Sequence, residues 1–208
     1  YKSVPEDAEK IGKIIKELQK NYDIRRIPGF YISENSTVRM VAPRGFFIPV
    51  RNREGKIASL LIRTEIKDAK YIFFSKSTFG GAKAWNIVHY TTPLEPGIEE
   101  LFVTEGILKA DVAYYLSGGK PFISVNGVGM WKHIADEIEY LKPRKVYICF
   151  DMDMYENKNV LESVKNLYER IKTKTKAEVL KWDRRYKGID DYLLARRLAT
   201  VKVQAGKQ

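Results

Sequence analysis

The chain begins with apolar residues at helical spacing. Ala8, Ile11, Ile15 and Leu18 recur three or four positions apart, with charged residues between them. This spacing puts one apolar stripe on a helix, and it predicts an amphipathic helix within residues 3–21. We therefore expect the chain to open with a helix that buries one face.

After this helix, short apolar runs alternate with turn residues. "GFFIPV" (45–50) and "KIASLLIRTE" (56–65) flank the turn "RNREG" (51–55), which predicts a β-hairpin. "KYIFFS" (70–75) predicts a third strand, and "GGAK" (80–83) a flexible glycine loop. The first part of the chain is therefore expected to be a small α+β domain.

The second part of the chain alternates between strands and helices. Apolar runs predict strands at 100–105, 122–126, 145–150 and 178–182. Helical spacing predicts helices at 107–116, at 132–141, and around Val160, Val164, Leu167 and Ile171. Strands joined by helices of this length form a parallel sheet with helices on both faces, so we expect an α/β domain.

The stretch "TTPLEPG" (91–97) is the best candidate for a domain boundary, because two prolines and a glycine disfavour regular structure. We therefore expect a basic N-terminal domain at 1–97 and an α/β domain at 98–208.

Charge and composition narrow the class of protein. The 37 Lys and Arg exceed the 26 Asp and Glu, for a net charge of +11, as is typical of proteins that bind polyphosphates. Solvated lysines on helices would give the same total, so charge alone decides nothing. The single cysteine, Cys149, excludes a disulfide framework and a multi-cysteine zinc site, and we interpret it as a core residue in a reducing compartment. No run of 18 apolar residues occurs and no signal peptide opens the chain, so we expect a soluble cytoplasmic protein without a membrane partner.

Acidic residues stand where two of the predicted strands end. Glu105 closes one strand, and Asp151 and Asp153 follow another. Parallel strands end at the same edge of a sheet, where ligands bind. Residues two apart in an extended stretch point the same way, so the two aspartates can share one ion. Clustered carboxylates suit Mg²⁺ or Mn²⁺, and we predict such a site here.

Three other interpretations of these acids compete. Surface acids at strand ends are common, and Asp153 alone could be one of them. An EF-hand loop over 151–162 would need a glycine where Glu156 stands and a preceding helix where a strand is predicted. A haloacid-dehalogenase-like phosphatase also uses Asp-x-Asp after an apolar strand, with Asp190 and Asp191 as its late acidic motif, but too little chain follows Asp151 for that fold.

Three motifs in this order resemble a known family. "VTEG" (103–106) followed by "FDMD" (150–153) resembles the Toprim domain, which bacterial-type (DnaG-like) primases share with topoisomerases and some nucleases. "RGFFIPVRNREGKIASLLIRTE" followed by "KYIFFSK" is similar to the basic subdomain that precedes Toprim in these primases. "KGIDDYLL" (187–194) resembles the segment that closes the Toprim core, in the form closest to plasmid, phage and mobile-element primases. The resemblance covers roughly residues 28–195.

The resemblance implies a fold and an activity. The fold would be a Toprim (Rossmann-like) parallel sheet flanked by helices, preceded by a small basic α+β subdomain. The activity would be that of a primase catalytic core, which joins nucleoside triphosphates into RNA primers on single-stranded DNA during DNA replication. Mg²⁺ or Mn²⁺ would be the cofactor, with no zinc in this chain, and a helicase partner is implied through segments absent here.

The resemblance also implies roles for individual residues. Catalysis and metal binding would fall to Glu105, Asp151 and Asp153. Nucleotide or template contacts would come from Arg63, Lys70, Lys76 and Lys83. The outer-shell candidates are Lys109, Asp111, Asp190 and Asp191; Lys109 is a departure, because many primases carry an acid there. A Toprim-type metal-dependent nuclease and a non-catalytic nucleic-acid-binding module stay open as alternatives.

Overall fold

The computed structural model describes residues 1–40, 42–75, 80–84 and 88–205, with side chains up to residue 199. The chain divides into two units. The first holds residues 1–50 and 57–86, and the second holds residues 51–56 and 87–208. The second unit thus begins before the proline-rich segment that we expected to close the first domain, and it also includes the turn 51–56.

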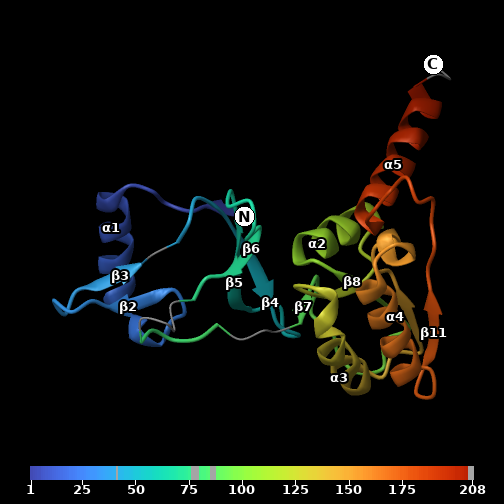
Figure 1. Ribbon diagram of the computed structural model, residues 1–208, viewed down its shortest axis with the longest axis horizontal. Helices are drawn as coiled ribbons and strands as arrows, with labels where there is room; N and C mark the ends of the chain where they lie inside the picture. The colour runs from blue at the N-terminus through green and yellow to red at the C-terminus, as the bar shows by residue number, and fades with distance from the viewer. Residues whose placement is uncertain (41, 76–79, 85–87, 206–208) are drawn as a thin grey trace. The chain divides into compact units, whose positions relative to one another are not determined.

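The first unit combines helix α1 (Ala8–Gln19) with a four-stranded sheet (Figure 1). The strand order is β1 (Lys2–Ser3), β4 (Gly45–Arg51), β5 (Ile57–Thr64) and β6 (Tyr71–Phe73). Asp7 is the N-cap of α1, and its carboxylate accepts hydrogen bonds from the backbone N–H groups of Glu9 and Lys10. The apolar stripe of α1 faces a core that includes Ile15, Phe30 and Ile62.

Residues 24–40 form structure that the apolar pattern did not predict. A 3-10 turn, η1 (Ile24–Arg26), leads into the antiparallel pair β2 (Phe30–Ile32) and β3 (Val38–Met40). These strands are three residues long, too short to show an alternating pattern in the sequence.

The second unit is a five-stranded sheet with helices on both faces, as predicted (Figure 1). The strand order is β11 (Lys176–Val179), β10 (Lys145–Ile148), β8 (Glu100–Glu105), β9 (Phe122–Val125) and β7 (His89–Tyr90). The first four of these strands run parallel. The helices are α2 (Ile107–Leu116), α3 (Trp131–Leu141), α4 (Lys158–Ile171) and α5 (Ile189–Ala205), with 3-10 turns η3 (Val128–Met130) and η4 (Met152–Tyr155).

Alternation along the strands separates the two faces of this sheet. Val103 of β8 packs in the cluster that contains residues of α3 and α4. Its neighbour Phe102 packs in the cluster that contains residues of α2 and α5, together with the completely buried Cys149. Successive side chains of a strand point to opposite faces, so each strand contributes to both cores.

Three details of the second unit differ from the sequence prediction. The sheet is mixed, because the two-residue edge strand β7 runs antiparallel to β9. β11 begins at Lys176, two residues before the predicted strand. α5 begins within the motif "KGIDDYLL" (187–194) and continues beyond it to Ala205. Among the described residues, no helix is both long and apolar enough to cross a membrane.

Candidate active site

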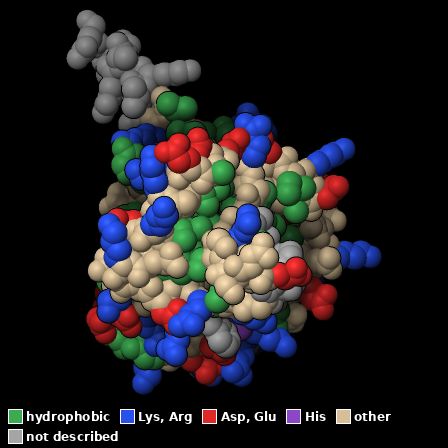
Figure 2. All heavy atoms as spheres, turned by 90° about the vertical axis from the view of Figure 1, so that its left-hand side faces the viewer, with side chains coloured by type: hydrophobic (Ala, Val, Ile, Leu, Met, Phe, Trp, Pro, Cys, Tyr) green, Lys and Arg blue, Asp and Glu red, His purple; other side chains and the backbone are tan. Residues whose placement is uncertain are grey.

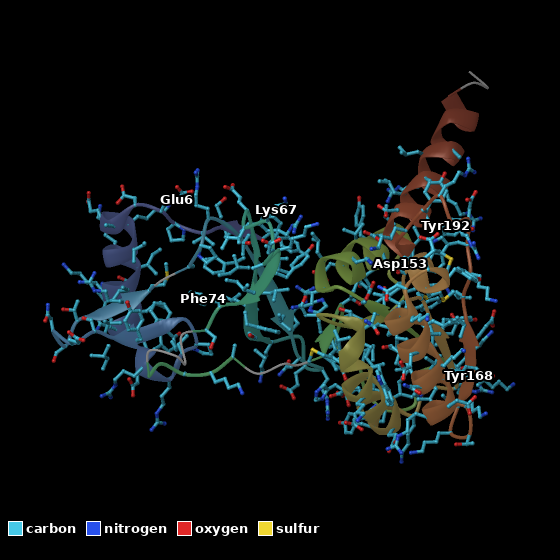
Figure 3. All side chains as sticks on the ribbon, in the orientation of Figure 1. Glu6, Lys67, Phe74, Asp153, Tyr168 and Tyr192 are labelled. Atoms are coloured by element: carbon cyan, nitrogen blue, oxygen red, sulfur yellow. The ribbon has the colours of Figure 1, made fainter. Side chains whose placement is uncertain are left out.

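Three carboxylates meet at the carboxyl ends of two neighbouring strands in the second unit. Glu105 is the last residue of β8, and Asp151 and Asp153 follow β10. One carboxylate oxygen from each lies within 4.8 Å of the others. Asp153 lies at the end of the unit where α5 begins, whereas Tyr168 of α4 lies at the opposite end (Figure 3). The sheet edge therefore brings these three predicted residues together.

The backbone around the cluster fixes these positions. Gly106, which directly follows Glu105, has φ +83°, a conformation that glycine adopts at little cost and other residues rarely adopt. This residue turns the chain sharply from β8 into α2. The Thr104 hydroxyl donates a 2.9 Å hydrogen bond to the Cys149 carbonyl, which holds β8 to the end of β10. The acids are thus held by strand ends rather than by a long loop.

Burial of these carboxylates in their ionised form costs free energy unless a cation lies close to them. Asp151 is only 2% exposed. Burial raises the pKa of Glu105 to about 8, and the neighbouring Asp151 carboxyl adds to the effect. Asp153 Oδ1 is buried and has no hydrogen-bond partner among the described residues. An unpartnered carboxylate oxygen beside two other acids suits a hard cation, so these three residues fit a bound metal ion.

Two lysines pair with the acids. Lys109 Nζ, from α2, donates to Asp151 Oδ1 and lies 3.9 Å from Glu105 Oε1. Lys187 Nζ lies 2.8 Å from Asp153 Oδ2 and 3.7 Å from Asp151 Oδ2. The backbone supports the second pair, because the N–H of Met152 donates to the carbonyl of Lys187 at 2.9 Å.

Lys187 was not among the residues singled out from the sequence. It opens the segment 187–194 that carried the family resemblance, but nothing in its local spacing connects it with Asp153, more than 30 positions earlier. Lys109, by contrast, stands only four residues after Glu105, in the first turn of α2, so it is close to the acid along the chain as well as in space.

The other outer-shell candidates have different surroundings. Asp190 lies close to Gly188 and Lys109, and burial raises the pKa of its carboxyl while the Lys109 charge opposes the shift. Asp191 accepts a 3.3 Å hydrogen bond from the Gly188 N–H at the start of α5. Asp111 pairs with the Arg51 guanidinium and with His89. Of these, Asp190 is the one that shares Lys109 with the acidic cluster.

The basic candidates of the first unit are placed only within that unit. The Arg63 guanidinium stacks on the Tyr71 ring at 4.9 Å, and its Nη1 is buried without a hydrogen-bond partner among the described residues. Lys70 and Lys83 are exposed, and Lys76 lies outside the described residues. Figure 2 faces this unit and shows Lys and Arg side chains spread over its surface, with acidic and hydrophobic side chains between them. A contact between these cations and the acids stays a prediction.

Comparisons with solved structures identify the fold. The zinc-binding and RNA polymerase domains of Aquifex aeolicus primase match over 91% of this chain and 46% of theirs, at 14% identity and a TM-score of 0.64. The RNA polymerase domain of Mycobacterium tuberculosis DnaG matches over 90% and 69%, at 16% identity and a TM-score of 0.57. A DnaG primase catalytic domain bound to single-stranded DNA matches over 90% and 59%, at 12% identity and a TM-score of 0.55. The chain thus spans about half the length of the solved Aquifex chain, and the predicted primase-core fold is confirmed.

Sequence comparisons give a family. No curated protein matches the chain. A family model described as "Domain of unknown function (DUF3854)" matches residues 95–199, a segment that runs from just before β8 into α5 and includes the whole acidic cluster. This match covers half of the chain, which therefore belongs to the DUF3854 family and has the fold of a DnaG-type primase catalytic core.

Proposed function

We propose that this chain is a primase-type catalytic core, with a Toprim domain that joins nucleoside triphosphates into RNA primers on single-stranded DNA. The observation that carries the proposal is the cluster of Glu105, Asp151 and Asp153 at the carboxyl edge of a primase-type sheet. Structural similarity to primase cores supports a primase-like function, and one of these cores is bound to single-stranded DNA. The protein would act in the cytoplasm during DNA replication, and a helicase is a candidate partner.

The three acids would hold Mg²⁺ or Mn²⁺. A bound ion would neutralise the triphosphate and lower the pKa of the attacking hydroxyl, which is the chemistry that phosphoryl transfer requires. Asp151 and Asp153 would be the anchoring ligands. Glu105, whose pKa is raised to about 8 by burial, would be a further ligand or would accept the hydroxyl proton.

The basic residues of the first unit would bind the nucleotide and the template backbone. Arg63 is the strongest candidate, because a guanidinium can hold a phosphate through two parallel hydrogen bonds and one of its nitrogens is without a partner among the described residues. Lys70, Lys76 and Lys83 would add single charged contacts.

Incorporation of labelled nucleotides on single-stranded DNA tests the proposal. With Mn²⁺ or Mg²⁺, the chain should extend primers from ribonucleoside triphosphates, and Asp151→Asn should abolish the product. Asp136→Asn is the matched control, because Asp136 is an exposed aspartate on α3. Loss of labelled DNA instead of primer synthesis would favour a Toprim-type nuclease, and binding without either reaction a non-catalytic module.

A further inference from the structure

We infer that this centre takes one divalent cation and that the Lys109 ammonium occupies the place of a second. The inference rests on the proposed function, because it assumes that the three acids hold a metal. It concerns how many ions they hold, which the fold and the acidic cluster leave open.

The Lys109 side chain is largely buried among the acids of the cluster. Its side chain is only 19% exposed, and its ammonium donates to the nearly fully buried Asp151 and lies 3.9 Å from Glu105. A buried carboxylate that has a charged partner at close range is strongly bound to it, because little water competes for either group. Lys109 therefore lies between two of the three carboxylates as a fixed charge.

Gly188, which directly precedes α5, packs against the Lys109 side chain. A Cβ atom at Gly188 would lie 3.1 Å from Lys109 Cε and 3.2 Å from Lys109 Cδ, and 2.2 Å from Asp190 Oδ1. Any side chain at position 188 would thus press on the Lys109 stem and on the carboxylate beside it. The backbone of Gly188 does not have positive φ, so the absence of a side chain, rather than a special conformation, is what the packing requires.

Lys187 differs from Lys109 in its exposure to solvent. Its side chain is 64% exposed, and its ammonium contacts the other side of the cluster, at Asp153 Oδ2 and Asp151 Oδ2. An exposed, flexible lysine can leave for water at small cost when a divalent ion arrives. One cation position is therefore open at Asp151 and Asp153, on the side that Lys187 covers.

Charge balance supports one ion rather than two. Once a bound ion has displaced the proton of Glu105, the three carboxylates carry three negative charges; Lys109 offsets one of them, and one divalent ion offsets the other two. A second divalent ion between Asp151 and Glu105 would meet the Lys109 ammonium at contact distance in a partly buried site, where like charges repel strongly.

Counting bound Mn²⁺ on the full chain tests this inference. Titration followed by electron paramagnetic resonance of free Mn²⁺ should give one bound ion per chain. Lys109→Met keeps most of the aliphatic stem and removes the charge, and it should bind two ions, with spin coupling between them. Lys187→Met is the matched control, and it should still bind one ion, more tightly than the unchanged chain because a competing cation is gone.

The outcomes separate this inference from the proposed function. Two ions in the unchanged chain, or one ion in a folded Lys109→Met, would overturn it. If Lys109→Met does not fold by circular dichroism, Lys109→Gln, which keeps a donor for Asp151, replaces it and carries the same expectation. Binding of one and two ions without primer synthesis would leave the inference standing and overturn the primase proposal. Absence of Mn²⁺ binding in every variant would overturn both.

Discussion

His89 Nε2 lies 3.0 Å from Asp111 Oδ1, and the imidazole is completely buried. Its other ring nitrogen, Nδ1, accepts a 3.1 Å hydrogen bond from the Arg51 backbone N–H, so in the neutral ring the proton is on Nε2 and faces the carboxylate. The Arg51 guanidinium also pairs with Asp111. This network joins β7, α2 and the turn 51–56 within the second unit.

Acid should destabilise the second unit through His89. Burial lowers the pKa of His89 below its usual 6.5; Asp111 opposes this effect and the Arg51 charge adds to it. The unfolded chain therefore binds the proton first, so the stability from neutral His89 is complete above about pH 6.5 and is lost as the pH falls toward the folded pKa. Each tenfold difference in proton affinity between the folded and unfolded chains corresponds to about 1.4 kcal/mol. Urea unfolding of the unchanged chain and of His89→Gln, each at pH 5.5 and pH 7.5, isolates this loss.

The two histidines of the chain provide their own control for this effect. On going from pH 7.5 to pH 5.5, the unchanged chain should lose unfolding free energy relative to His89→Gln, whereas His133→Gln, at an exposed position of α3, should follow the unchanged chain. Glu105 titrates in the same range with the opposite sign, but it contributes equally to both variants. Equal pH dependence in the unchanged chain and in His89→Gln would contradict the prediction.

Divalent cations should stabilise the folded chain. An ion that binds only the folded state at a concentration of a hundred times its Kd adds about 2.7 kcal/mol to the free energy of unfolding. Thermal melts with Mn²⁺ and with EDTA measure the shift, which Asp151→Asn should remove and Asp136→Asn should retain. A shift of the same size in Asp151→Asn would exclude this cluster as the binding site.

Arg63 should matter for nucleotide use and not for Mn²⁺ binding. Arg63→Ala removes a charge-assisted contact, and we expect a loss of about 1–3 kcal/mol in kcat/KM for the triphosphate. Arg63→Lys should recover only part of it, because an ammonium cannot replace a planar guanidinium. Lys67→Ala, at an exposed position of the same unit (Figure 3), is the control. Melting curves show whether the loss of the Tyr71 contact destabilises Arg63→Ala, which would also lower its activity. Unchanged kinetics in Arg63→Ala would rule out the assigned role.

Replacing Gly106 by alanine should destabilise the fold through the backbone conformation at this position. Alanine at φ +83° costs about 1–2 kcal/mol, even though the nearest atom to its Cβ, Lys109 Cβ, lies at an ordinary 3.6 Å. Gly129→Ala in η3 is the control, since that residue has negative φ and nothing within 4 Å of a Cβ. Equal unfolding free energies for both variants would show that the turn after Glu105 can relax.

Much of the second unit could be predicted from its sequence, because the central strands β8, β9 and β10 are largely apolar and glycine and proline residues mark several of its turns. β8 and α2 have the predicted bounds, since Gly106 separates a run of apolar residues from a helical pattern. The meeting of Glu105 with Asp151 followed from the edge rule for parallel sheets. Local spacing could not reveal Lys187, which reaches the acids only through the tertiary path of the chain.

Weak or short patterns explain the remaining differences. β7 has two residues, too few for any periodicity, and its position depends on pairing with β9. The end of α5 carries mixed polar and apolar residues, so nothing in the pattern marked a helix beyond Leu194. The proposed roles of the basic residues depend on contacts with a nucleotide or template, which no local pattern in the sequence specifies.

The turn 51–56 makes the second unit discontinuous along the chain. The polypeptide passes from one unit to the other three times, after residues 50, 56 and 86, so no single cut separates them. A fragment that begins at residue 98 would lack Arg51 and Arg53, and would leave Asp111 and Glu137 without these guanidinium partners. Exchange of either unit between relatives would require two matched junctions around this turn as well as one after residue 86. Recombination should therefore transmit the two units together, as one inherited module.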